Sequence, residues 1–169
     1  MKKVLFVLGV LFILIQFIRP SRNLSDDLTY DISTKYSMSG EVSDILKGAC
    51  YDCHSNNTDY PWYSYIQPVG WWLNNHITTG KRHLDYSTFT KLPVANQSRK
   101  LEETIDQVEK KYMPLASYTY LGLHKKANLS DDQRKIISEW ARTQVDMLKA
   151  TYPADSLVLK RRPRVQPGN

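Results

Sequence analysis

The chain has 169 residues, which suits one small domain with additions at both ends. The formal net charge of +6 overstates how basic the folded part is, because eight of the 23 basic residues lie near the termini: Lys2, Lys3, Arg19, Arg22, Lys160, Arg161, Arg162 and Arg164. The remaining 15 face 17 acidic residues, which argues against a basic nucleic-acid-binding module. We therefore expect no nucleic-acid partner.

The N-terminus predicts a membrane segment. Lys2 and Lys3 precede an apolar run from Val4 to Ile18, and Arg19-Pro20 follows it. The run is short for a transmembrane helix, which usually takes ~20 residues, so a cleaved signal peptide is the competing interpretation. No pair of small residues spaced like a signal-peptidase site follows the run, which favours an uncleaved membrane anchor over residues 1–19.

Residues 20–37 are polar and predict a tether, and residues 38–150 carry helical patterns. The first predicted helix of this domain has one apolar stripe that ends in the two cysteines: Val42, Ile45, Leu46, Ala49, Cys50 and Cys53. The stripe predicts that the face carrying the cysteines also packs the core, so that the core is built around whatever the cysteines bind.

The motif Cys50-Tyr51-Asp52-Cys53-His54 uses both cysteines of the chain. Two thiols one helical turn apart leave the same face and reach the two vinyl groups of one porphyrin edge, and a histidine in the next position reaches the iron. The motif therefore predicts one covalent haem c. Cys50 and Cys53 are the predicted thioether residues, and His54 is the predicted proximal iron ligand.

Three other interpretations of the cysteines fit less well. A structural disulfide is one, and a thioredoxin-like redox pair, expected near a βαβ pattern that this chain lacks, is the second. A structural zinc site is the third, and it needs four ligands, so the motif has to recruit a distant histidine: His76, His83 or His124.

Three further helices are predicted downstream. One follows Pro68 and ends at Thr79 before Gly80, and another starts with Ser98 as its cap and ends at Met113-Pro114. The last opens with the capping box Ser130-Asp131-Asp132-Gln133 and carries the apolar positions Ile137, Trp140, Ala141, Val145 and Leu148. Residues 151–169 predict a basic, proline-containing, solvated tail, with docking to an acidic partner or phospholipid as the alternative.

Met113 is the best-placed candidate for the distal iron ligand, because the residue before a proline is pushed out of helical geometry onto an extended loop. The alternative is a core methionine at a helix end. His76, one helical turn after Trp72, is the rival, either as the distal ligand or, with Trp72, as part of the haem pocket. His124 is a third possibility. Seven aromatic residues between Tyr51 and Trp72 suit the apolar faces of a porphyrin.

The chain resembles the small haem-binding domain proteins of Bacteroidetes-type bacteria, which carry a membrane segment and one c-type motif. The resemblance runs from about Asp31 to Trp140 and rests on these stretches: Ala49–Asn56, Tyr60-Pro61-Trp62-Tyr63, Pro68–Trp72, His76-Ile77 with Gly80-Lys81, Met113-Pro114-Leu115 with Tyr118, and Leu129-Ser130. It implies a c-type haem, a helical cytochrome c-like fold and export across the inner membrane.

The sequence thus predicts an all-α, cytochrome c-like domain with an N-terminal membrane helix. Because thioether attachment takes place outside the cytoplasm, we expect a single-pass inner-membrane protein with its haem domain on the periplasmic side. The predicted function is electron transfer by a monohaem cytochrome, with a redox partner protein in or near the membrane, rather than catalysis. The alternative is a haem-based sensor or peroxidase-like enzyme with an open or displaceable sixth iron position, where His76 acts on a bound ligand.

Overall fold

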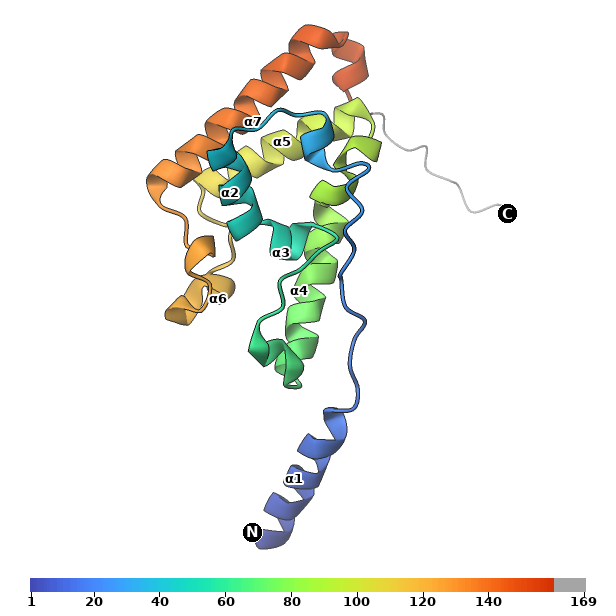
Figure 1. Ribbon diagram of the computed structural model, residues 1–169, viewed down its shortest axis with the longest axis vertical. Helices are drawn as coiled ribbons and strands as arrows, with labels where there is room; N and C mark the ends of the chain where they lie inside the picture. Colours follow the sequence, from blue (N-terminus) through green and yellow to red (C-terminus); the bar gives the residue numbers. More distant parts are fainter. Residues whose placement is uncertain (160–169) are drawn as a thin grey trace, which may run out of the picture.

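The computed structural model describes residues 1–159, which form α-helices and short 3₁₀ turns without any β-strand (Figure 1). The helices are α1 (Lys2–Ile15), α2 (Gly40–Ala49), α3 (Tyr51–His54), α4 (Val69–His83), α5 (Val94–Glu109), α6 (Ala116–Thr119) and α7 (Asp131–Thr151). The 3₁₀ turns span Ile32–Thr34, Trp62–Tyr65, Tyr86–Lys91, Tyr120–Gly122, Lys125–Ala127 and Ala154–Leu157. The all-α part of the predicted fold class is confirmed. The basic residues of the predicted C-terminal tail, Lys160, Arg161, Arg162 and Arg164, lie outside the described residues.

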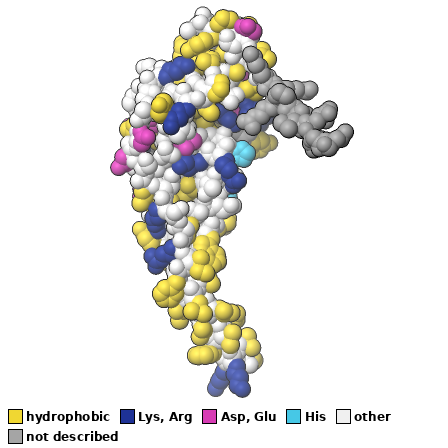
Figure 2. Space-filling model, turned by 90° about the vertical axis from the view of Figure 1, so that its right-hand side faces the viewer, with side chains coloured by type: hydrophobic (Ala, Val, Ile, Leu, Met, Phe, Trp, Pro, Cys, Tyr) yellow, Lys and Arg dark blue, Asp and Glu magenta, His cyan; other side chains and the backbone are white. Residues whose placement is uncertain are grey.

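The N-terminal helix α1 projects away from the rest of the molecule, and hydrophobic side chains cover it on the face that Figure 2 shows. It has 14 residues, so at 1.5 Å per residue it is much shorter than the ~30 Å hydrocarbon core of a bilayer. Within residues 1–159, none of the helices combines the length and the apolar character that crossing a membrane requires. The predicted N-terminal membrane helix and the predicted single-pass inner-membrane localisation are therefore wrong.

The end of α1 is tied to the body by polar contacts. The Gln16 side chain donates from Nε2 to the Gln67 carbonyl at 3.2 Å and accepts from the Gln67 backbone N–H at 2.8 Å. Trp71 adds a bond from its indole N–H to the Ile18 carbonyl at 2.8 Å. These contacts fix where the chain leaves α1 and crosses to the rest of the fold.

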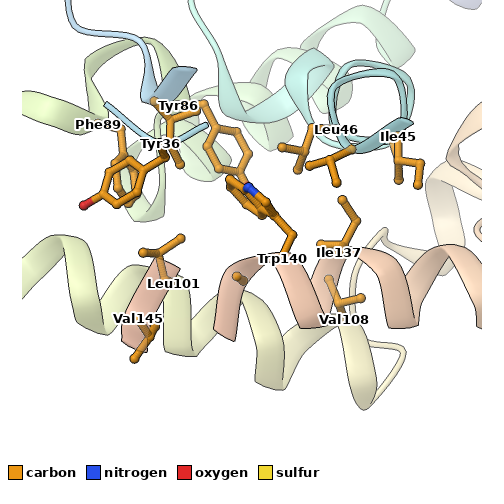
Figure 3. Packing of buried hydrophobic residues seen from close by; sticks show 14 of the residues in the cluster. Tyr36, Ile45, Leu46, Tyr86, Phe89, Leu101, Val108, Ile137, Trp140 and Val145 are labelled. Atoms are coloured by element: carbon orange, nitrogen blue, oxygen red, sulfur yellow. The ribbon is translucent and has the colours of Figure 1, made fainter. Parts of the chain in front are cut away.

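The core lies where α2 and the turn Tyr86–Lys91 meet the long pair α5 and α7, which pack along one another (Figures 1 and 3). Its members include side chains from all of these elements and Tyr36, which precedes α2: Tyr36, Ile45, Leu46, Tyr86, Phe89, Leu101, Val108, Ile137, Trp140 and Val145. Each side chain of this size that leaves water contributes roughly 1.5–3 kcal/mol. Cys50 packs against this cluster, whereas Cys53 and His54 do not belong to it. The face of α2 that leads to the cysteines thus packs the core, as the stripe predicted, and Cys50 extends that contact to the motif.

The helix ends follow local chemistry. The Ser130 capping box is present at the start of α7, with Ser130 accepting from the Gln133 N–H and the Gln133 side chain accepting from the Ser130 N–H. Helix α5 starts at Val94, right after Pro93 and four residues before the predicted cap Ser98, whose side chain is buried instead. Helix α4 continues past Gly80 to His83.

The folded domain begins earlier in the chain than Met38. Ile32 and Tyr36, at the end of the segment predicted as a tether, have 0 % exposed surface. The Tyr36 hydroxyl donates to the Gln97 side chain on α5 at 2.5 Å, and its ring meets Phe89 edge-on at 5.7 Å between centroids. The residues around them are mostly polar and include Pro20, and this composition led to the prediction of a tether instead of core residues.

Candidate functional site

The two cysteines lie on a single tight turn that interrupts the predicted attachment helix. Helix α2 ends at Ala49, and Cys50 has φ −121° and ψ −40°, which breaks the regular helix before α3 begins. The Cys50 carbonyl then accepts from the backbone N–H groups of Cys53, at 3.2 Å, and His54, at 3.0 Å. The turn therefore brings both thiols and the imidazole to neighbouring positions, and the two cysteines form no disulfide.

Both thiols are held in their neutral form. Burial, with a smaller contribution from the neighbouring Cys53, raises the pKa of the Cys50 thiol to about 12. Burial and the Asp52 carboxylate raise the pKa of Cys53 to about 11. A reactive redox thiol instead needs a lowered pKa. Within residues 1–159, moreover, no three His, Cys, Asp or Glu side chains are grouped so that they can hold a metal ion, so neither the redox pair nor the zinc site is supported.

The His54 imidazole has a fixed direction. Its Nδ1 lies 2.9 Å from the Leu84 carbonyl oxygen, which only accepts, so Nδ1 carries the proton and Nε2 keeps a free lone pair. Burial lowers the pKa of His54 and favours this neutral form. The ring of Tyr86 meets the imidazole edge-on, at 6.4 Å between centroids. His54 thus presents Nε2 as a metal ligand whose opposite nitrogen is held by the backbone, an arrangement typical of histidine ligands.

Helix α4 reaches the attachment turn because Gly80 allows the two backbones to approach closely. A Cβ atom at position 80 would lie 2.7 Å from the Cys53 carbonyl oxygen, a distance that real Cβ contacts do not show. The Gly80 carbonyl accepts from the Leu84 N–H at 2.8 Å, so the same helical turn also positions the carbonyl that holds His54. Gly80 therefore acts as a contact residue inside α4, and not as the helix end that its residue type predicted.

The side of the turn that carries Tyr51 is anchored in the body of the domain. The Tyr51 hydroxyl lies 3.4 Å from both carboxylate oxygens of Asp31, a buried residue of the N-terminal segment. The Tyr51 ring stacks on Tyr86 with 5.3 Å between centroids. Tyr86 consequently contacts two residues of the motif, Tyr51 on its face and His54 at its edge.

A cluster of polar aromatic residues covers another side of the motif. The Tyr118 hydroxyl donates to Asp52 Oδ2 at 2.7 Å, and the Tyr118 ring stacks on the His124 imidazole at 3.8 Å. His124 Nε2 shares a hydrogen bond with the Tyr63 hydroxyl. Burial lowers the pKa of His124 and raises that of Tyr63, so both are neutral at pH 7.

The sequence did not predict this cluster, since Tyr63, Asp52 and Tyr118 come from three separate segments. A signal was nevertheless available: Tyr118 and His124 lie in the polar aromatic stretch that follows Met113 and has no helical apolar stripe.

Met113 lies on the loop that carries Tyr118 to the motif. Its backbone carbonyl accepts from Arg134 Nη1 at 2.7 Å, and the same nitrogen donates to the Val108 carbonyl at the end of α5 at 3.0 Å. The Arg134 guanidinium is also close enough to Cys50 to lower the pKa of that thiol in part. Met113 is half-buried. Arg134 thus ties the main chain at Met113, the predicted distal ligand, to the end of α5.

Trp72 and His76 lie on α4 and contact each other, with their ring centroids 4.4 Å apart. His76 is half-buried and precedes Gly80 by one helical turn, on the helix that packs against α3. Trp72 remains 43 % exposed. The structure therefore brings His76 toward the motif along α4, but it ties His124 to the motif more directly, through Tyr118 and Asp52.

Comparison with known proteins adds one match. A family model described as a haem-binding domain matches residues 10–143, a stretch that contains the motif, α2 to α6, and most of α7. Neither the curated proteins nor the solved structures include a match to this chain.

Proposed function

The chain belongs to the haem-binding domain family, and on that basis we propose that it is a monohaem c-type cytochrome that transfers electrons. Cys50 and Cys53 would form the two thioether bonds to one haem, and His54 would bind its iron on the proximal side. Met113 would be the distal ligand, and a redox partner protein would exchange electrons with the iron. Haem binding follows from the family, whereas the covalent attachment, the ligand set and the electron transfer rest on the residues of this chain.

The observation that supports this proposal most is the pairing of a directed imidazole with two free thiols on one turn. The Leu84 carbonyl holds the Nδ1 proton of His54 at 2.9 Å, so that Nε2 is the nitrogen left for iron. Cys50 and Cys53 are free, neutral and three residues apart. This donor set fits a haem attached at two positions and ligated from the same turn.

Bound haem supplies the one-electron exchange between ferrous and ferric iron. The Leu84 carbonyl draws on the Nδ1 proton and so raises the basicity of Nε2. Tyr86 packs against the edge of the same imidazole and restricts its rotation. A ligand held from two sides keeps its geometry when the charge on the iron changes, which favours fast electron exchange.

The loop that contains Met113 has the support that a distal ligand needs. Arg134 holds the Met113 main chain, and Tyr118, five residues further on, holds the loop to Asp52 of the motif. Met38 and Met147, in contrast, pack against the main core. The ligation His54/Met113 is therefore favoured over ligation by Met38 or Met147. His76 is the rival ligand, and together with Trp72 it is a candidate for the wall of the haem pocket.

The proposal is tested on the full chain produced together with the c-type maturation machinery. Haem staining after denaturing electrophoresis reports covalent attachment, and we expect it to disappear when Cys50 and Cys53 are both replaced by alanine. The oxidised protein should show the long-wavelength absorption band of sulfur–iron coordination. Met113→Ala should abolish this band, and the matched variant Met147→Ala should keep it.

Two outcomes would contradict the proposal. Absence of covalent haem from the wild-type chain would refute the c-type attachment. A high-spin iron that binds carbon monoxide rapidly and is unchanged by Met113→Ala would refute the closed electron-transfer site. That second result would favour the sensor or peroxidase-like alternative, in which His76 and the Tyr118–His124 cluster are the groups to examine next.

A further inference from the structure

The segment before the folded domain runs alongside the residues that follow the motif. The backbone N–H of Ser25 donates to the Asn56 carbonyl at 2.8 Å, and the N–H of Thr58 donates to the Asn23 carbonyl at 3.0 Å. Leu24 and Asn57 form an isolated antiparallel bridge between them. A stretch predicted as a flexible tether is thus paired, residue by residue, with the chain that leaves His54.

Both polar atoms of the Asn23 side chain make hydrogen bonds where these two segments pair. Its Nδ2 donates to the Ser55 carbonyl at 2.8 Å and to the Thr58 hydroxyl at 2.9 Å. Its Oδ1 accepts from Lys81 Nζ on α4 at 2.6 Å. The Asn23 amide therefore links Ser55, the residue directly after His54, to α4, which ends at His83, next to Leu84.

The Thr58 hydroxyl extends this link into the motif itself. Thr58 is 3 % exposed, and its Oγ1 donates to the Asp52 carbonyl at 2.6 Å while it accepts from Asn23. Its hydrogen-bonding capacity is therefore used on both sides. Hydrogen bonds thus hold the main chain of the motif on both sides of His54. Thr58 bonds to the Asp52 carbonyl, and Asn23 bonds to the Ser55 carbonyl and to Thr58 itself.

We infer that Asn23 is a positioning residue for the His54 ligand: it fixes the attachment turn relative to α4, and thereby keeps His54 Nδ1 within hydrogen-bonding distance of the Leu84 carbonyl. The inference rests on the proposed role of His54 as an iron ligand. Lys81 is the contact on the α4 side, since it lies three residues before Leu84 and also faces Asp85 at 3.9 Å. Ser55 is the contact on the motif side.

The expected effect lies in the iron coordination. A weaker bond from Nδ1 to Leu84 makes Nε2 less basic, which stabilises ferric iron less and raises the reduction potential. Loss of such a supporting contact typically costs 10–100-fold in metal affinity or activity, and Asn23 acts one residue further out, so about tenfold is the upper bound that we expect. A tenfold change in a one-electron equilibrium corresponds to 59 mV.

The experiment compares Asn23→Ala with Asn57→Ala in the holoprotein. Asn57 belongs to the same pair of segments, but within residues 1–159 its side chain bonds only to the exposed Asp26, at 2.6 Å. We expect both variants to carry the same amount of covalent haem. Only Asn23→Ala should raise the reduction potential and change the low-spin g values of the ferric electron paramagnetic resonance spectrum. Unchanged potential and g values in Asn23→Ala would overturn the inference.

A second pair keeps the test decisive if Asn23→Ala does not fold. Thr58→Val removes the hydroxyl and keeps the shape of the side chain, whereas Thr58→Ser keeps the hydroxyl. We expect Thr58→Val to shift the potential upward and Thr58→Ser to restore the wild-type value; equal values for the two would refute the role of the Asn23–Thr58 link. Failure of the proposed function is recognised separately, since it shows as missing covalent haem or a different ligand set in the wild-type protein.

Discussion

The close approach of α3 and α4 predicts a specific response to Gly80→Ala. The added Cβ would lie 2.7 Å from the Cys53 carbonyl oxygen and 3.4 Å from its carbonyl carbon and Cβ, whereas ordinary contacts begin at about 3.4 Å. The conflict is with backbone, so α3 and α4 have to separate. Such overpacking costs about 1–3 kcal/mol, and the better helix propensity of alanine returns up to about 1 kcal/mol. We expect a net loss of about 1 kcal/mol in the free energy of unfolding.

The matched control is Gly40→Ala, at the first residue of α2, where nothing lies within 4 Å of an added Cβ. Its unfolding free energy should stay within about 0.5 kcal/mol of the wild-type value. Urea unfolding of the two holoproteins, followed by far-ultraviolet circular dichroism, gives both midpoints. The absorption spectrum of Gly80→Ala should change as well, because the helical turn that holds Leu84 moves away from His54. A midpoint of Gly80→Ala equal to or above that of Gly40→Ala, with an unchanged spectrum, would refute the packing argument.

Two further substitutions test the surroundings of the site. Tyr118→Phe removes the hydroxyl that donates to Asp52 at 2.7 Å and should lower the free energy of unfolding, measured by urea unfolding, by about 1–2 kcal/mol. Tyr120→Phe is the control, because that side chain is 71 % exposed and its hydroxyl makes no such bond within residues 1–159, and it should be neutral. Equal effects of the two substitutions would contradict the role of the Tyr118 contact. Ser130→Ala removes the N-terminal cap of α7 and should cost about 1 kcal/mol in the same assay, and a loss below 0.3 kcal/mol would show that the capping box adds little.

The sequence predicted those parts of the fold that depend on neighbouring residues. The Ser130 capping box and the apolar stripe from Val42 to Ala49 both rely on contacts within one or two helical turns, and both are present. The five-residue motif is equally local. Its spacing and residue types alone predicted haem, and the family match supports haem binding independently.

Other features depend on residues far away in the chain and had no local pattern. Gly80 has the residue type of a helix end, but the approach of Cys53 explains why a glycine stands inside α4. The N-terminal run has the composition of a membrane helix, yet α1 ends at Ile15, and the next residue, Gln16, is bonded to Gln67. Composition therefore predicted the apolar character of this segment correctly, while its helical length decided against a membrane span.

The direction of the His54 imidazole shows most clearly what the motif leaves open. The motif supplies the imidazole, but the carbonyl that orients it comes from Leu84, thirty residues later in the chain. The hydrogen bond that holds Ser55, directly after His54, comes from Asn23, which precedes the motif. Neither His54 nor Cys53 belongs to the main core cluster, so these supports can be altered while the packing around Trp140 persists. Ligand geometry and global stability are thus separable in this protein. A substitution at Asn23 should therefore change the spectrum and the potential of the iron more than it changes the unfolding midpoint.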